Sequence, residues 1–187
     1  MSLFLIDPHV IQLCLAGKPK GHELLYKGSA PYAFSIARRY LENQEDCKDV
    51  MQEAYAKTFT NIKQYDAEKG PFKFWFRRIV VNCCLKLRQK QKAFLTVEGD
   101  LSEDSIDSSY LESIQLSREE IKKLLQEMPE RYRIVFMLSV IDEFTHKEIA
   151  EQLNITSETS RSQLTRAKKW LRKHLEGSKK WEQYGLL

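Results

Sequence analysis

The sequence has few residues that interrupt helices, since its 187 residues include only 7 glycines and 5 prolines. It also has no apolar run approaching the roughly 20 residues needed to cross a bilayer. The first ten residues lack a basic start and a complete apolar core, so they do not predict a signal peptide. Together with the helical periodicity of the chain, these absences predict an all-α cytoplasmic protein without direct membrane insertion.

Cysteine and histidine are too scarce and too scattered to predict a metal site or a catalytic centre. No two histidines follow an HExxH spacing, and no cysteines follow a zinc-binding spacing. We therefore expect no metal, no cofactor and no enzymatic activity. The cysteines should be buried, reduced thiols, as is usual in the cytosol; they are Cys14, Cys47, Cys83 and Cys84.

Charge is distributed unevenly along the chain, although the net charge is only +4. Residues 77–92 contain six basic and no acidic side chains, and residues 158–180 contain eight basic and two acidic ones. Between them, residues 98–112 contain six acidic and no basic side chains. Two basic blocks separated by an acidic one indicate two contacts with a polyanion and a spacer that avoids it.

Helical periodicity predicts three helices in the first half of the chain, at about residues 33–41, 44–62 and 73–91. A loop is expected at residues 65–71, where Gly70 precedes Pro71. Residues up to about Gly28 form a variable opening that is interrupted at residues 17–21.

The second half begins after a long acidic, serine-rich stretch that is too long for a loop inside a compact domain. A capping-box pattern at Ser117 then opens a helix that ends near Pro129, and another helix follows at 130–141. The expected architecture is two small helical domains joined by an acidic, flexible linker. Its segments are an N-terminal segment at 1–21, a first domain at 22–92, the linker at 93–116, a second domain at 117–175 and a tail at 176–187.

The most informative stretch is 145–175, which predicts two short helices around a tight turn. Thr145 and Glu148 form a capping-box pattern at the first helix, and Ser157 is placed to cap the second. At about 100° per residue, one side of the second helix carries Ser160, Leu164, Ala167, Leu171 and Leu175. The opposite side carries Ser162, Arg166, Lys169 and Lys173. A basic helix alone is more often a solvated surface, but the capped partner helix and the short turn favour a helix-turn-helix that enters the DNA major groove.

Two helices of the first domain also have distinctive polar faces. The polar side of the helix at 44–62 carries Asp46, Asp49, Gln52, Glu53 and Thr60. Periodicity alone favours a solvated surface there, and the alternative is a docking surface for a basic partner.

The helix at 73–91 has a face of Trp75, Arg78, Asn82, Lys86 and Gln89 next to an aromatic segment. Flat rings, cations and an amide are the groups that single-stranded DNA binding requires. Phe74 and Phe76 are expected to belong to the core. The face of Arg78, Asn82 and Lys86 has the alternative of a solvated surface.

The order and spacing of six motifs are similar to those of a known family. The motifs are ARRYL (37–41), DCKDVMQE (46–53), FWFRRIVVN (74–82), MPERYR (128–133), EIA (148–150) and SQLTRA (162–167). Together they resemble a sigma factor of bacterial RNA polymerase, and more narrowly the two-domain extracytoplasmic-function (ECF) group. The chain departs from the family at Cys47, where alanine is common, and at Ser160, where a β-branched apolar residue is common. Neither position has an implied role.

The resemblance implies roles for both domains. The first domain would dock on the β′ clamp helices of core polymerase through Asp49, Gln52 and Glu53. It would also melt and bind the minus-ten element through the loop at 64–73 and through Trp75, Arg78, Asn82 and Lys86. The second domain would place its recognition helix in the minus-thirty-five element. The residues that match base-contacting positions are Arg161, Ser162, Thr165 and Arg166, and those near phosphates are Lys169 and Lys173.

The resemblance also implies partners and a cellular place. The partners are core RNA polymerase, including its β subunit, and promoter DNA. An anti-sigma factor is a third partner that many members of the family have. The protein would be cytoplasmic, associated with the nucleoid when bound to polymerase, or held at the membrane by such an anti-sigma factor. The acidic linker would run toward the RNA exit path. The main alternative is a stand-alone helix-turn-helix regulator whose first 92 residues form a sensor or dimerisation domain.

Overall fold

The computed structural model describes residues 6–92 and 124–176, and all regular structure in these two ranges is helical. The chain divides into two compact units, residues 1–97 and 98–187. This confirms the all-α fold with two helical parts. The linker expected at 93–116 and the capping box expected at Ser117 lie outside the described residues. No helix in the described ranges is long and apolar enough to cross a membrane.

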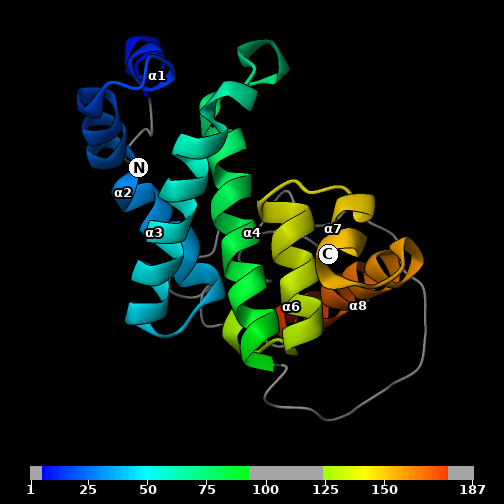
Figure 1. Cartoon of the computed structure of the whole chain (residues 1–187). Coiled ribbons are helices and arrows are strands. Elements are labelled where there is room, and N and C mark those ends of the chain that lie inside the picture. The colour runs from blue at the N-terminus through cyan, green and yellow to red at the C-terminus, as the bar shows by residue number, and fades with distance from the viewer. Residues whose placement is uncertain (1–5, 93–123, 177–187) are drawn as a thin grey trace. The chain divides into compact units, whose positions relative to one another are not determined.

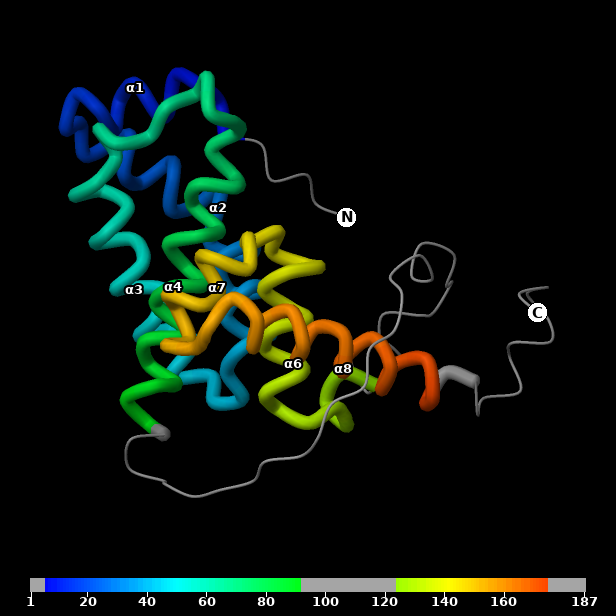
Figure 2. The backbone as a smooth tube through the Cα atoms, turned by 90° about the vertical axis from the view of Figure 1, so that its right-hand side faces the viewer, coloured from blue at the N-terminus to red at the C-terminus, as the bar shows by residue number. Residues whose placement is uncertain are grey.

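The first unit is built from four helices and two short 3₁₀ turns (Figure 1). They are α1 (Pro8–Leu15), α2 (Pro19–Tyr40), α3 (Gln44–Asn61), η1 (Ile62–Gln64), η2 (Ala67–Lys69) and α4 (Phe72–Lys92). Helices α2, α3 and α4 pack against one another, and α1 packs on α2 (Figure 2). The core between them contains the fully buried side chains Leu25, Ile36, Val50, Phe76 and Val80.

The start of this unit corrects the sequence prediction, because α2 begins at Pro19 and not near residue 33. Proline fits the first turn of a helix, where its missing N–H has no intrahelical partner to lose. Gly21 allows α1 to approach closely, since a Cβ added there would lie 2.6 Å from the Cβ of Leu13. Residues that were interpreted as helix breakers therefore begin α2 and let α1 pack on it.

Phe74 and Phe76 were both expected in the core, and the structure confirms this only for Phe76. Phe76 is fully buried, whereas Phe74 is 39% exposed and lies beneath the guanidinium of Arg77. Two residues along a helix correspond to about 200° of rotation, so the two rings cannot face the same side.

The second unit contains a helical segment at 124–127, α6 (Glu130–Phe136), the π-helix η3 (Met137–Ile141), α7 (His146–Leu153) and α8 (Ser157–Glu176). One cluster of its core contains Met128, Phe136, Ala167 and Leu171, with Leu164 and Trp170 packed against them. The helix expected at 130–141 is present, but its last turn is widened to the π form.

Helices α7 and α8 form the expected helix-turn-helix. Both hydrogen bonds of the capping box between Thr145 and Glu148 are present. The chain turns at Asn154, whose left-handed backbone (φ 54°, ψ 48°) ends α7. The cap of α8 differs from the prediction, because Thr156 Oγ1 accepts the hydrogen bond from Thr159 N at 3.0 Å. Ser157 was expected at the N-cap position, but it is the first residue of α8.

Candidate nucleic-acid interface

The two sides of α8 differ as the helical periodicity predicts. Ser160, Ala167 and Leu171 are buried against the rest of the second unit. The predicted minus-thirty-five residues lie on the accessible side. Arg161, Lys169 and Lys173 are exposed, and Ser162, Thr165 and Arg166 are partly exposed. Leu175, expected on the packed side, belongs to the positions whose side chains are not described.

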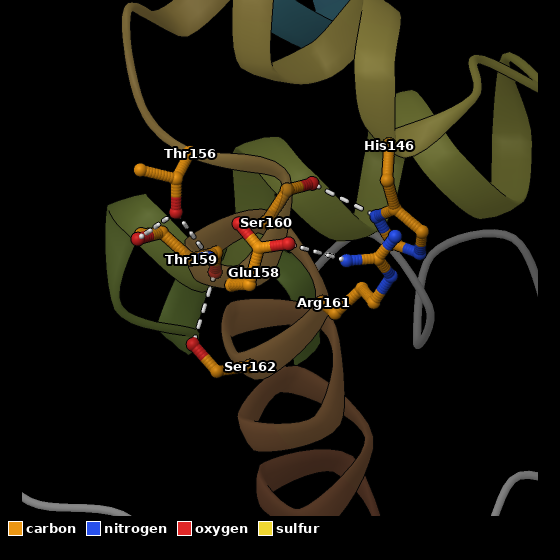
Figure 3. Close-up of polar contacts among 7 residues, drawn as sticks. All are labelled: His146, Thr156, Glu158, Thr159, Ser160, Arg161 and Ser162. Carbon is orange, nitrogen blue, oxygen red and sulfur yellow. Dashed lines mark hydrogen bonds and ion pairs between the residues drawn. The ribbon is translucent and has the colours of Figure 1, made fainter.

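The first turns of α8 are organised by short-range polar contacts (Figure 3). Glu158 Oε1 pairs with Arg161 Nη1 at 3.2 Å, and both side chains are well exposed. Ser162 Oγ donates to the carbonyl of Thr159 at 3.0 Å, and Thr165 Oγ1 donates to the carbonyl of Arg161 at 3.1 Å. Each hydroxyl oxygen can still accept a hydrogen bond, and the guanidinium has further donors. The helix therefore presents donors and acceptors on one side, as base reading in a major groove requires.

One contact at this site was missed by the sequence analysis. His146 Nδ1, at the start of α7, is hydrogen-bonded to Ser160 Oγ on α8 at 2.9 Å. Burial lowers the pKa of His146, and the positive charges of Arg161 and Lys168 lower it further. The sequence analysis placed Ser160 on the packed side of the helix and noted it as a departure from the usual apolar residue. A polar residue on an apolar stripe was the available signal, but it did not identify the partner.

In the first unit, α3 presents the predicted polymerase-binding residues on its accessible side. Asp49 and Gln52 are exposed, and the neighbouring Val50 and Ala54 are buried in the core. The third residue, Glu53, is only partly exposed. The exposed acid and amide therefore form a polar surface on a helix that is fixed by its opposite side.

Glu53 connects α3 to α4 through a small charged cluster. Its Oε1 atom lies 2.8 Å from Lys57 Nζ and 3.7 Å from Lys86 Nζ. Lys57 Nζ also lies 3.5 Å from the buried Sγ of Cys83. The hydrogen bond to Lys57 lowers the pKa of the Glu53 carboxyl, and burial raises the pKa of the Cys83 thiol. The structure thus joins a residue predicted to bind polymerase to one predicted to bind DNA.

The four residues predicted for the minus-ten element occupy different environments on α4. Arg78 and Lys86 are exposed. Trp75 is partly buried and packs near Tyr65 and Phe72, with ring centroids 5.8 and 5.5 Å apart. Asn82 is partly buried, and its Oδ1 atom has no hydrogen-bond partner in the part of the chain that the structure describes. The cations are accessible, whereas the ring and the amide are set into the surface.

All four cysteines are free and buried, as expected. Within residues 6–92 and 124–176, no group of three or more potential ligands is placed to hold a metal ion.

The fold and the site define a two-unit helical protein whose second unit carries a helix-turn-helix. Residues 25–94 match the family model for sigma-70 region 2, and residues 118–171 match the model for sigma-70 region 4. The chain is 29% identical over 160 residues to the ECF RNA polymerase sigma factor SigW of Bacillus subtilis (strain 168), covering 76% of this chain and 82% of that protein. It is 25% identical over 187 residues to the ECF RNA polymerase sigma-E factor of Escherichia coli (strain K12), covering 90% and 93%.

A solved structure titled "Structure of CnrH in complex with the cytosolic domain of CnrY" has the same fold, with a TM-score of 0.51 and 17% identity over 92% of this chain and 98% of that one. The chain belongs to the ECF RNA polymerase sigma factors. It directs promoter recognition by RNA polymerase and is not an enzyme. The alternative of a stand-alone regulator does not fit a first unit that matches sigma region 2.

Proposed function

We propose that the exposed side of α3 docks on the β′ clamp helices of core polymerase. The observation that carries this proposal is the pair of exposed residues Asp49 and Gln52 beside a fully packed apolar stripe. A rigid helix with an exposed carboxylate suits a basic partner surface, and such charge complementarity favours specificity and a fast association rate. Glu53 contributes at the edge of this surface, where it also holds Lys57 and Lys86.

The same unit is proposed to capture the melted minus-ten element along α4. Arg78 and Lys86 are accessible to phosphates, and Trp75 lies in an aromatic group that a base could extend by stacking. Asn82 would read a base edge through its amide. Its Oδ1 is buried, so the atom that reads DNA would be Nδ2 unless the side chain turns. The loop at 64–73, which contains η2, borders this surface.

In the second unit, α8 is proposed to read the minus-thirty-five element. Arg161, Ser162, Thr165 and Arg166 would meet bases, and Lys169 and Lys173 would meet phosphates. The support is that all six lie on the accessible side of a helix whose other side is buried. Arginine suits guanine edges, whereas lysine acts mainly as a point charge toward phosphate.

The domain limits and the remaining partners are also part of the proposal. We take residues 22–92 and 117–175 as the two functional domains, joined by the acidic stretch at 93–116, which would follow the path toward the RNA exit. Contacts with the β subunit accompany docking on β′. An anti-sigma factor is proposed as a regulator, in keeping with the complex that the structural neighbour CnrH forms with a cytosolic domain. The proposed location is the cytoplasm, at the nucleoid or beside a membrane-held anti-sigma factor.

Reconstitution with and without core polymerase tests the proposed docking and DNA contacts together. The full chain should direct core enzyme to open a selected promoter, and neither component should do so alone. Asp49→Lys should weaken recruitment while leaving the helical content of the protein unchanged. Unaltered recruitment of this variant would remove α3 from the proposed polymerase interface, and the family assignment would stand.

A further inference from the structure

A hydrogen bond joins the two helices of the helix-turn-helix at their N-terminal ends (Figure 3). Ser160 is completely buried on a side of α8 that is otherwise apolar. A buried hydroxyl without a partner is costly, and here the partner is Nδ1 of His146 at 2.9 Å. The polar residue at this position is therefore matched by a specific acceptor or donor on the neighbouring helix.

The contact differs physically from the apolar packing around it. Close packing of the core sets the approximate rotation of each helix, but the apolar contacts that do so are non-directional. A hydrogen bond weakens steeply when its angle departs from linearity, and it therefore fixes a rotation as well as a distance. His146 is the first residue of α7, and Ser160 lies in the first turn of α8, so the bond fixes the beginning of the recognition helix.

The residue that follows Ser160 is Arg161, which projects from the accessible side. Its guanidinium is held on one flank by Glu158 at 3.2 Å and lies close enough to His146 for its charge to act on the imidazole. If α8 rotated about its own axis near Ser160, the side chain of Arg161 would move sideways in the DNA major groove. The reach of Arg161 to a base edge thus depends on the bond between His146 and Ser160.

We infer that His146 is a positioning residue, which holds Ser160 and thereby aims Arg161 at one base pair of the minus-thirty-five element. The inference rests on the proposed function of α8. His146 does not need to touch DNA in this role, because it acts through the orientation of the recognition helix.

Two isosteric replacements of His146 separate positioning from simple loss of the imidazole. Asparagine places an amide group near the position of Nδ1, which bonds Ser160, whereas glutamine places its amide near the position of Nε2. His146→Asn should keep the contact and His146→Gln should lose it. Ser160→Ala removes the other partner. The double variant His146→Gln, Ser160→Ala completes a double-mutant cycle, which isolates the interaction energy between the two side chains.

The assay uses the full chain bound to core polymerase and a duplex DNA library randomised at the minus-thirty-five element. Arg161→Ala first identifies the base pair whose preference depends on Arg161. At that position, His146→Gln and Ser160→Ala should each reduce the ratio of matched to mismatched affinity by roughly three- to tenfold, the range of one net hydrogen bond. The double variant should be no worse than either single one, and His146→Asn should resemble the wild type.

Matched controls come from groups with only local contacts. His174→Gln removes an imidazole whose Nδ1 lies 2.8 Å from a carbonyl of its own helix, and Ser35→Ala removes a hydroxyl that bonds within α2. Both should leave every base preference unchanged.

Three outcomes would overturn the inference. An equal loss of affinity for all sequences in His146→Gln and Ser160→Ala would show a purely stabilising contact. A normal preference in these variants, when Arg161→Ala relaxes it, would overturn the positioning role and leave the function of α8 intact. A normal preference in Arg161→Ala itself would overturn both the inference and the base-reading role of Arg161.

Discussion

The Glu158–Arg161 ion pair of the second unit lies within one helix, whereas the Glu53 cluster of the first unit spans two helices. On α8, Glu158 pairs with Arg161 within one turn of the same helix, at 3.2 Å. In the first unit, one oxygen of Glu53 on α3 lies near both Lys57 and Lys86, the latter on α4. Exposed local pairs contribute only about 0–1 kcal/mol, so the α8 pair can open for DNA at little cost. The Glu53 cluster instead links the proposed polymerase surface on α3 to the proposed DNA surface on α4. A substitution on one surface should therefore change binding at the other.

The difference indicates how each unit would bind. The recognition helix can present its side chains without rearranging its neighbours. On the α3–α4 surface, Lys86 lies 3.7 Å from Glu53, so a DNA phosphate that approaches this lysine also changes the surroundings of the carboxylate. The following substitutions test this comparison, starting with the largest expected effect.

The largest effect is expected at Asp49, which lies on α3 outside the Glu53 cluster. Asp49→Lys should weaken binding to core polymerase by on the order of 2 kcal/mol or more, because it reverses the charge of a proposed desolvated pair. The fold should be unaffected, since the side chain is exposed. Titration of labelled protein with core enzyme measures the change.

Glu45→Lys is the matched control, because Glu45 is an exposed acid one turn earlier on α3 whose partner is Lys48 on the same helix. It should change core affinity much less. Equal affinities for Asp49→Lys and the wild type would contradict the polymerase-binding role of Asp49.

On α8, substitutions of a base-reading residue and of a phosphate-contacting residue should have different effects on DNA binding. Arg166→Ala is expected to cost about 1–3 kcal/mol on the preferred promoter and to relax its sequence preference. Lys173→Ala should weaken all sequences similarly and reduce the slope of log affinity against log salt by about one unit. Binding of the holoenzyme to matched and mismatched minus-thirty-five duplexes at several salt concentrations distinguishes the two. Identical behaviour of both variants would contradict the division of roles along the helix.

Asn82 tests the α4 surface at the step of promoter melting. Asn82→Ala should spare core binding and minus-thirty-five binding but reduce open-complex formation, by about 1 kcal/mol if one base contact is lost. Permanganate footprinting of unpaired thymines reports the open fraction. On a template whose minus-ten region is already unpaired, the defect should shrink if Asn82 helps to extrude the base, and persist if it reads that base. Normal opening on several promoters would leave Asn82 as a structural residue only.

The smallest effect should come from Glu53, and its sign tests the link between the two surfaces. Glu53→Gln removes the carboxylate that holds Lys86, so free protein should bind single-stranded minus-ten oligonucleotide up to about fivefold more tightly. Its affinity for core polymerase should fall, because the same carboxylate belongs to the proposed docking surface. Glu45→Gln should change neither affinity. Unchanged binding of the oligonucleotide by Glu53→Gln would show that the two surfaces act independently.

Several elements were predictable because they depend on residues within one or two turns of a helix. The bounds of α3 and α4, the capping box at Thr145 and the division of α8 into packed and accessible sides all follow from local spacing. The order of the motifs also identified the family, which the matches to sigma-70 regions 2 and 4 confirm.

The start of α2 and the rings of α4 show where local rules fail. Residues 17–21 were interpreted as a break, but Pro19 fits the first turn of α2 and α1 packs closely against Gly21. Phe74 and Phe76 are chemically alike, and only the direction in which α4 packs decides that Phe76 is buried.

The sequence by itself determined the helical class, the helix-turn-helix and the set of side chains on each helical face, because periodicity and capping act over a few residues. Only the tertiary structure decided which of these side chains meet. Glu53 faces Lys86, and His146 faces Ser160, because the rotation of each helix is set by its packing against the others. That rotation depends on the fit of the whole core, so no single motif in the sequence specifies it.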